Sequence, residues 1–155
     1  MKIGVSFPTT EVGNDPIVMR DFAQAAEDMG YEYLTAIDHV LQARDPAGDD
    51  FRAYYTIDNA FHEPLILFSY LAGVTSKIGF VTAILILPQQ PTVLVAKQAA
   101  QLDLMSGGRL RLGCRDWLER PRVRCDGSEL QEPGAAHLRT IRLNETALDG
   151  RNCHI

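Results

Sequence analysis

The fold of this chain is decided by residues 78–87, which read IGFVTAILIL. The run is apolar at nearly every position and rich in β-branched residues, which is the pattern of a strand buried on both faces of a sheet. Pro88 ends the run. Strands buried in this way are typical of a parallel sheet that has helices packed against it.

Helix signals lie on both sides of this strand. The sequence predicts one helix that begins at Glu63-Pro64 and runs to about Ser76, and a second over residues 92–105. Residues 106–108, Ser-Gly-Gly, are a helix C-cap and tight turn by their composition. A further strand is expected at 109–113, directly after that turn.

The N-terminal segment continues the same alternation. Residues 2–7 and 31–37 are expected to be strands, and the helix between them begins with Asp15 as N-cap and Pro16 at its first position. The order β-α-β-α-β-α-β predicts a parallel sheet with right-handed crossovers. A doubly wound sheet and a (β/α)8 barrel both fit. The turn after the first strand lacks G-x-G-x-x-G, which modestly favours the barrel.

Size and charge restrict the class of protein. The chain has 155 residues, about one domain, with a net charge of −5 and a pI near 5.3. An acidic chain is a poor match for nucleic acid. Its apolar runs fall short of the ~20 residues that span a bilayer. The N-terminus goes straight into a strand pattern without a signal-peptide core. We therefore expect a cytoplasmic protein with neither nucleic acid nor membrane as its partner.

Five short segments occur together and in order along residues 1–113. They are Ala36–Val40 (AIDHV), Phe61–Leu65 (FHEPL), Leu85–Pro88 (LILP), Ala96–Ala100 (AKQAA) and Leu102–Leu110 (LDLMSGGRL). Together they resemble the luciferase-like monooxygenase superfamily, and most of all its branch of F420-dependent oxidoreductases. The last segment is the most specific of the five.

The resemblance implies both a fold and an activity. The fold would be a partial (β/α)8 TIM barrel made of about the first four strands and three helices. It would hold FMN or coenzyme F420 at the C-terminal ends of its strands, the face where barrel enzymes place their chemistry. The activity would be that of an oxidoreductase or monooxygenase that transfers a hydride or oxygen to a small organic substrate.

Candidate site residues stand where the predicted strands end. His39 has a side chain suited to proton transfer near neutral pH, and Asp38 could orient it or stabilise its charged form. The resemblance implies that this pair lies beside the cofactor, whereas the simpler alternative is a capping Asp followed by a surface His. Phe7 ends the first strand and is expected to contact the cofactor there.

The resemblance implies that the third strand supplies the remaining cofactor contacts, Thr82, Ala83 and Ile84. Many relatives carry a bulge here with a non-prolyl cis peptide that supports the flavin ring, and the aligned bond is Ala83–Ile84. The alternative is a regular buried strand. No metal site is expected, because His62-Glu63 lacks the second histidine of H-E-x-x-H.

The last 42 residues, 114–155, depart from the resemblance. All three cysteines and the only tryptophan follow Gly113, and neither Phe nor Tyr occurs beyond it. Read one base later, codons for residues 114–120 permit the V-G-x-G-W-N that the family usually has. Two later stretches also permit family-like R-G-R-R and L-W-T. We therefore treat 1–113 as the N-terminal half of the barrel and 114–155 as an out-of-frame or disordered tail.

Other functions remain open for such a chain. It could be a non-catalytic fragment, or a shortened binding module that uses the half barrel and the tail as a partner surface. Half a barrel has unpaired sheet edges that invite association. A homodimer of half-barrels is therefore expected if the chain is soluble.

Overall fold

The computed structural model describes residues 1–40 and 59–115. Strands and helices alternate along the chain, as the sequence predicts. The elements are β1 (Gly4–Ser6), α1 (Pro16–Asp28), β2 (Tyr33–Ala36), α2 (Pro64–Ala72), β3 (Gly79–Thr82), β4 (Leu85–Ile86), the 3-10 turn η1 (Leu87–Gln89), α3 (Thr92–Ser106), β5 (Leu110–Arg111) and β6 (Cys114–Arg115).

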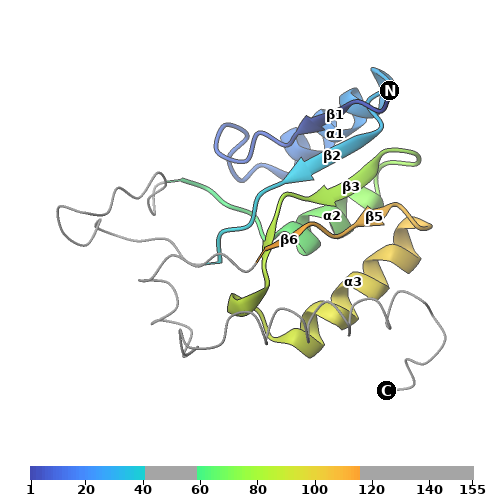
Figure 1. Cartoon of the computed structure of the whole chain (residues 1–155). Coiled ribbons are helices and arrows are strands. Elements are labelled where there is room, and N and C mark those ends of the chain that lie inside the picture. The colour runs from blue at the N-terminus through green and yellow to red at the C-terminus, as the bar shows by residue number, and fades with distance from the viewer. Residues whose placement is uncertain (41–58, 116–155) are drawn as a thin grey trace.

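Four strands form one parallel sheet in the order β1-β2-β3-β5 (Figure 1). One register row runs across it through Val5, Leu34, Phe80 and Leu110. Leu34 and Phe80 in this row are fully buried. The four predicted strands therefore pair side by side and in parallel, which confirms the expected wall of consecutive β/α units.

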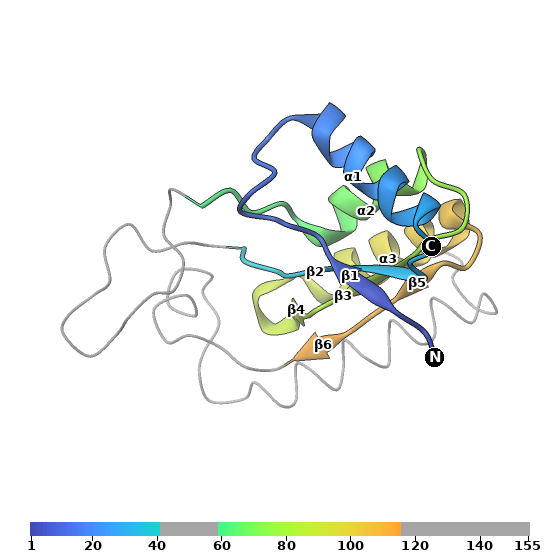
Figure 2. The same cartoon turned by 90° about the horizontal axis from the view of Figure 1, so that it is seen from above.

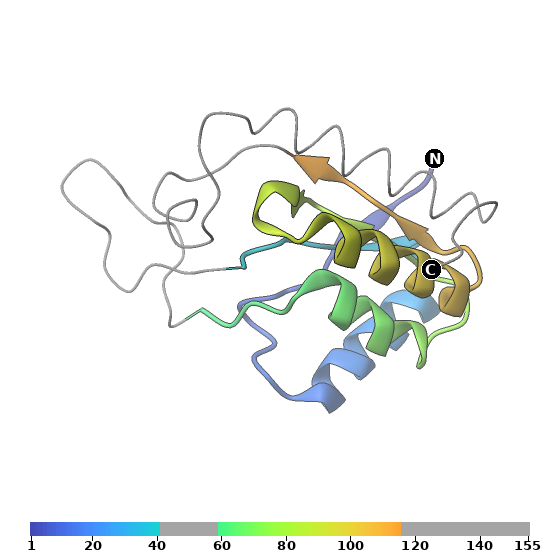
Figure 3. The ribbon, with the colours of Figure 1, turned by 90° about the horizontal axis from the view of Figure 1, so that it is seen from below.

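All three helices lie on one face of this sheet. Figure 2 and Figure 3 show α1, α2 and α3 side by side on that face. The start of α1 is the predicted one, because Pro16 is its first residue and the Asp15 carboxylate accepts a hydrogen bond from the Ile17 N–H at 2.8 Å. No helix in the described part of the chain is long and apolar enough to cross a membrane.

Helix α2 ends four residues earlier than predicted, at Ala72 rather than Ser76. Gly73 is the C-cap residue of the helix, and a residue far along the chain binds the segment that follows. Arg109 donates hydrogen bonds to the carbonyl oxygens of Ala72 at 2.9 Å and Thr75 at 3.2 Å. These carbonyls are thereby satisfied outside a helix. The end of α3 is the predicted one, since Gly107 and Gly108 both have positive φ, 72° and 81°.

The apolar run at 78–87 is not one strand. It breaks at the Ala83–Ile84 peptide, which is cis, so β3 ends at Thr82 and β4 begins at Leu85. Of the two expectations for this run, the bulge holds. Strand β4 then pairs in parallel with β6, so regular structure continues two residues beyond Gly113. The expectation of an irregular tail otherwise falls on residues 116–155, outside the described part.

Candidate functional site

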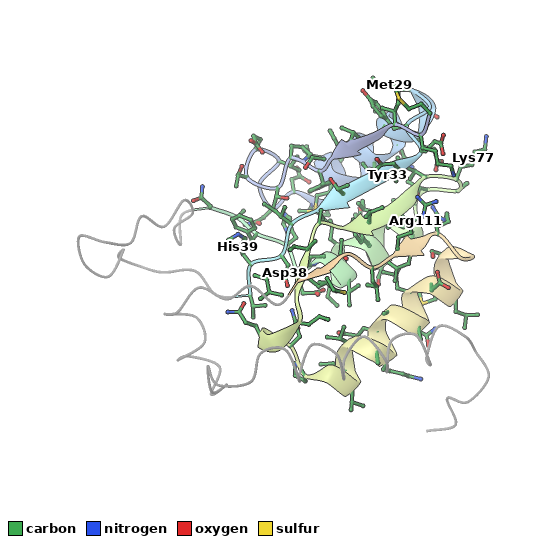
Figure 4. The ribbon with its side chains drawn as sticks, viewed as in Figure 1. Met29, Tyr33, Asp38, His39, Lys77 and Arg111 are labelled. Carbon is green, nitrogen blue, oxygen red and sulfur yellow. The ribbon has the colours of Figure 1, made fainter. Side chains whose placement is uncertain are left out.

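The predicted site residues gather at the C-terminal edge of the sheet. Parallel pairing sets Ser6 beside Thr35 and Ala36 beside Thr82, so the residues that follow these strands meet. The Phe7 N–H donates to the Thr35 carbonyl at 2.8 Å, which extends the pairing past β1. In Figure 4, Asp38 and His39 lie together at this edge.

Asp38 is buried, with 4% of its surface exposed. Its Oδ2 accepts a hydrogen bond from the Ile86 N–H at 2.9 Å. The carboxylate therefore connects the end of β2 to β4, directly after the break in the third strand. The sequence alternative, a helix-capping aspartate, does not describe this contact, because Ile86 belongs to a strand.

His39 is half-buried, and its ring lies against Phe61 with centroids 4.4 Å apart and planes at 43°. Phe61 belongs to the stretch that precedes α2, so chain far along the sequence returns to this edge. The next residue, His62, donates from Nε2 to the Gly13 carbonyl at 2.9 Å, because a carbonyl can only accept. His62 thereby connects that stretch to the loop before α1.

The Phe7 ring packs into the core beneath the site. It makes an edge-to-face contact with Phe22 of α1, with centroids 5.5 Å apart, and another with His62 at 6.3 Å. Only 3% of the residue is exposed. Phe7 thus lies at the predicted edge of the sheet, and its ring packs against that of His62.

Thr82 and Gly113 are joined by two reciprocal hydrogen bonds. The Thr82 Oγ1 accepts from the Gly113 N–H at 2.8 Å and donates to the Gly113 carbonyl at 2.9 Å. A Cβ on Gly113 would overlap the Thr82 carbonyl oxygen, so the close approach of these two strands requires glycine. At the break itself, the Ala83 N–H donates to the Ala36 carbonyl at 2.7 Å.

Glu63 is a site residue that the sequence analysis treated only as a helix start. Its Oε2 accepts from the Ile66 N–H at 2.6 Å, which caps α2. Burial raises the pKa of this carboxyl, backbone N–H donors of Ile66 and Leu65 partly offset that, and the charge of Asp38 raises it further. The site therefore contains two interacting carboxyl groups.

Gln89 is a second residue that the sequence did not reveal. It ends η1 and is buried with 8% exposed, and neither Nε2 nor Oε1 of its amide has a hydrogen-bond partner among the described residues. A Pro-Gln-Gln-Pro stretch has the composition of an ordinary loop, so only the structure shows this burial.

A hollow of about 310 Å³ opens at the same edge of the sheet. Its lining comes from the end of β1, the loop after it and the end of β2: Ser6, Phe7, Pro8, Thr9, Thr10, Glu11 and Ile37. Within the described ranges, no group of three or more His, Cys, Asp or Glu side chains could hold a metal ion.

Comparison with known proteins gives one family. The family model for luciferase-like monooxygenase matches residues 1–151. Over 99 residues the chain is 35% identical to the uncharacterized protein Rv0940c of Mycobacterium tuberculosis (strain ATCC 25618 / H37Rv), an alignment that covers 59% of this chain and 33% of that protein. The uncharacterized protein Mb0965c of Mycobacterium bovis matches with the same values.

Solved structures share the fold. The monooxygenase RslO1 from Streptomyces bottropensis superposes with a TM-score of 0.72 at 16% identity, over 93% of this chain and 42% of that one. The oxygenating constituent of 3,6-diketocamphane monooxygenase from Pseudomonas putida, solved in complex with FMN, gives 0.72 at 18%, over 94% and 40%. The coenzyme F420-dependent tetrahydromethanopterin reductase from Methanopyrus kandleri gives 0.58 at 22%, over 85% and 31%.

These likenesses show a mixed α/β chain that covers part of a luciferase-like TIM barrel. The chain aligns with about a third of the length of the curated relatives and about two fifths of the first solved structures. The family match runs past Gly113 to residue 151. The out-of-frame origin of residues 114–155 stays a prediction, which sequencing the gene around the Gly113 codon tests.

Proposed function

The chain belongs to the luciferase-like monooxygenase family, and we propose that it carries the cofactor-side part of an oxidoreductase that uses FMN or coenzyme F420. The observation that supports this most strongly is the meeting of Asp38, His39 and Thr82 at the C-terminal edge of a parallel sheet. Barrel enzymes place their chemistry at that edge. The substrate would be a small organic molecule.

The residues at this edge fit a ring cofactor in two respects. The half-buried rings of His39 and Phe61 offer an apolar wall, and the Gln89 amide is buried without a partner among the described residues. Mostly apolar walls with a few placed polar groups are typical of cofactor sites. Phe7, Thr82, Ala83 and Ile84 would complete the wall. The bound cofactor would supply the hydride or oxygen chemistry.

In this proposal His39 is the residue that holds or moves a proton at its imidazole nitrogen, because an imidazole can serve as acid and base near neutral pH. Asp38 is a positioning residue. Its carboxylate accepts a hydrogen bond from the Ile86 N–H and so fixes the backbone that would lie beside the cofactor ring. The hollow at Ser6–Glu11 and Ile37 is the proposed place for the substrate.

Titration of the 155-residue chain with FMN and with F420, followed by ring fluorescence, tests the proposal. We expect saturable binding of one of them, and a loss of about tenfold in affinity, equal to about 1.4 kcal/mol, in His39→Ala and Asp38→Ala. Asp28→Asn is the matched control, because Asp28 is exposed at the far end of α1. Equal affinity in all four chains would remove the site residues from the proposal.

A second candidate is a non-catalytic fragment or a shortened partner-binding module. The observation that favours it is coverage, since the chain matches 31–42% of the length of the solved enzymes named above. In the described part of the sheet, β1 and β5 each pair on one side only. Size-exclusion chromatography at several concentrations, with and without cofactor, separates a homodimer from a monomer. Binding of neither cofactor would favour this second candidate.

A further inference from the structure

Gln89 carries a carboxamide that is buried without a hydrogen bond in the described part of the chain. The residue is 8% exposed, and both Nε2 and Oε1 lack partners there. Its neighbours Leu85 and Leu87 belong to the apolar core. Burying an unpaired amide is unfavourable, so such a group in a folded protein calls for a polar partner.

Two hydrogen bonds fix the backbone around Gln89, and the acceptor of one of them is Asp38 of the proposed site. The Ile86 N–H donates to Asp38 at 2.9 Å, and the Gln90 N–H donates to the Leu87 carbonyl at 3.0 Å, which closes the turn. Gln89 is the last residue of η1, and Ile86, whose N–H is bound by Asp38, directly precedes that turn. Gln89 thus follows by three residues the backbone that Asp38 holds.

The chemistry of the amide limits its ligand. A glutamine side chain offers a carbonyl oxygen that accepts and an NH2 that donates, next to each other. A carboxylate would leave Oε1 unsatisfied, and an ammonium group would leave Nε2 unsatisfied. A ligand with an N–H next to a C=O satisfies both atoms at once. Lactams and imides have that edge.

We infer that Gln89 binds the imide edge of the cofactor's pyrimidinedione ring, donating from Nε2 to a ring carbonyl and accepting at Oε1 from the adjacent ring N–H. The inference rests on the proposed function. Flavins and deazaflavins share this edge, so Gln89 recognises what the two cofactors have in common. It holds the ring and leaves the choice between FMN and F420 to other contacts.

The sharpest test uses a probe that differs only at this edge. The 155-residue chain is titrated with FMN and 3-methyl-FMN, and with 5-deazariboflavin and its 3-methyl derivative, by ring fluorescence and calorimetry. The methyl group replaces the hydrogen of the ring N–H from which Oε1 would accept a hydrogen bond. We expect the unmodified ring to bind at least about tenfold more tightly, a step of about 1.4 kcal/mol. This arm needs no substitution and so does not depend on the folding of a variant.

Gln89→Leu completes a double-mutant cycle. It should bind the unmodified ring about tenfold more weakly and should no longer distinguish it from the methylated ring. Gln90→Leu, at the next position, is the matched control and should keep both the affinity and the discrimination. Without ligand, Gln89→Leu should melt no lower than the parent chain, because it removes a buried amide that has no partner in residues 1–40 and 59–115.

The outcomes separate the two proposals. Equal binding of the methylated and unmodified rings by the parent chain overturns the role of Gln89 and leaves the proposed function in place. If Gln89→Leu still binds the unmodified ring more tightly than the methylated ring, the role of Gln89 is likewise overturned and the proposed function stays in place. If the parent chain binds none of the four rings, both the proposed function and this inference fail.

Discussion

Glu27 and Glu63 lie at opposite ends of the sheet, and their carboxyl groups titrate in opposite directions. Burial raises the pKa of Glu27, but the N–H groups of Ile78, Lys77 and Ser76 outweigh it, and the pKa is lowered overall. Burial raises the pKa of Glu63, fewer backbone donors offset it, and the charge of Asp38 adds to the rise. A glutamate carboxyl thus has a lowered pKa at one end of the sheet and a raised pKa at the other.

At the N-terminal end of the sheet, charged side chains bind backbone groups. Arg109 stacks over Phe80 at 5.1 Å and donates to several oxygens: the carbonyls of Ala72, Thr75, Ile78 and Ser106, and Oγ1 of Thr75. Lys77 and Arg111 are labelled at this end in Figure 4, opposite Asp38 and His39. The C-terminal end has the Gln89 amide, which is unpaired among the residues that the structure describes, and the carboxyls of Asp38 and Glu63.

We interpret this difference as a division between a part that holds the fold together and a part that, under the proposed function, binds a ligand. Polar groups satisfied by the chain itself stabilise the fold and specify one arrangement. Buried polar groups that the chain leaves unsatisfied, and groups with raised pKa, are where functional sites concentrate. Substitutions at the two ends should therefore have different consequences.

The largest effect is expected at Arg109. Arg109→Met keeps an apolar stem over Phe80 and removes the donors to four carbonyl oxygens. Each polar group left unsatisfied costs about 1–3 kcal/mol, so we expect the free energy of unfolding to fall by about 3 kcal/mol in a urea titration. Arg111→Met, at an exposed position of β5, should change it by less than about 0.5 kcal/mol. Equal effects would contradict the structural role of the N-terminal end.

Thr82 tests whether the other end also contains structural pairs. Thr82→Val keeps the shape of a side chain that is 1% exposed but removes both hydrogen bonds with Gly113. We expect a loss of about 2 kcal/mol in the same titration, because the part-buried Gly113 N–H loses its acceptor, while the Gly113 carbonyl keeps only the Leu85 N–H as a donor. Thr35→Val, at a half-buried position of β2, serves as control. A neutral Thr82→Val would place all of the structural pairing at the N-terminal end.

Local patterns along the sequence were enough for the strands of the main sheet, the start of α1 and the end of α3. Asp15-Pro16 and Gly107-Gly108 act through neighbouring residues, so their effect is visible in the sequence itself. The early end of α2 falls at Gly73, a local signal, but the Ala72 carbonyl is bound by Arg109, which is 37 residues further along the chain. No local pattern could report that contact.

The candidate site was predictable to the same extent. Parallel strands bring Asp38, His39 and Thr82 to one edge, which follows from the element order alone. The break at Ala83–Ile84 came from the family resemblance, because an apolar run has no signal of its own for it. Gln89 could not be found, since the burial of a polar side chain is a property of packing.

Glu27 gives a smaller effect that depends on pH. Its pKa is lowered from 4.5, so the stability it contributes is present above that pH and is lost as the pH falls through its folded-state pKa. Glu27→Gln keeps an acceptor but not the charge. At pH 7 it should be less stable by about 1 kcal/mol, the difference between a charged and a neutral acceptor. Thermal melts between about pH 3 and pH 7 should show the two chains converging toward the acid end, where the Glu27 carboxyl becomes neutral like the amide. If the difference in melting temperature between the two chains stays constant with pH, the carboxylate charge is not what stabilises residues 76–78, whose N–H groups Glu27 binds.

The smallest expected effect concerns the pair of carboxyls at the C-terminal end. Asp38→Asn removes the charge that raises the pKa of Glu63 and keeps an oxygen that can accept from the Ile86 N–H. The pKa of Glu63 should fall, because the charge of Asp38 is one of the causes that raise it. Carbon-detected NMR titration of the Glu63 carboxyl, assigned through Glu63→Gln, measures this. Asp28→Asn, at an exposed position on α1, should leave the titration unaltered. If Asp38→Asn leaves the Glu63 pKa where it was, the two carboxyls do not interact. The C-terminal end would then differ from the other end in burial alone, and Gln89 would be the remaining sign of a ligand there.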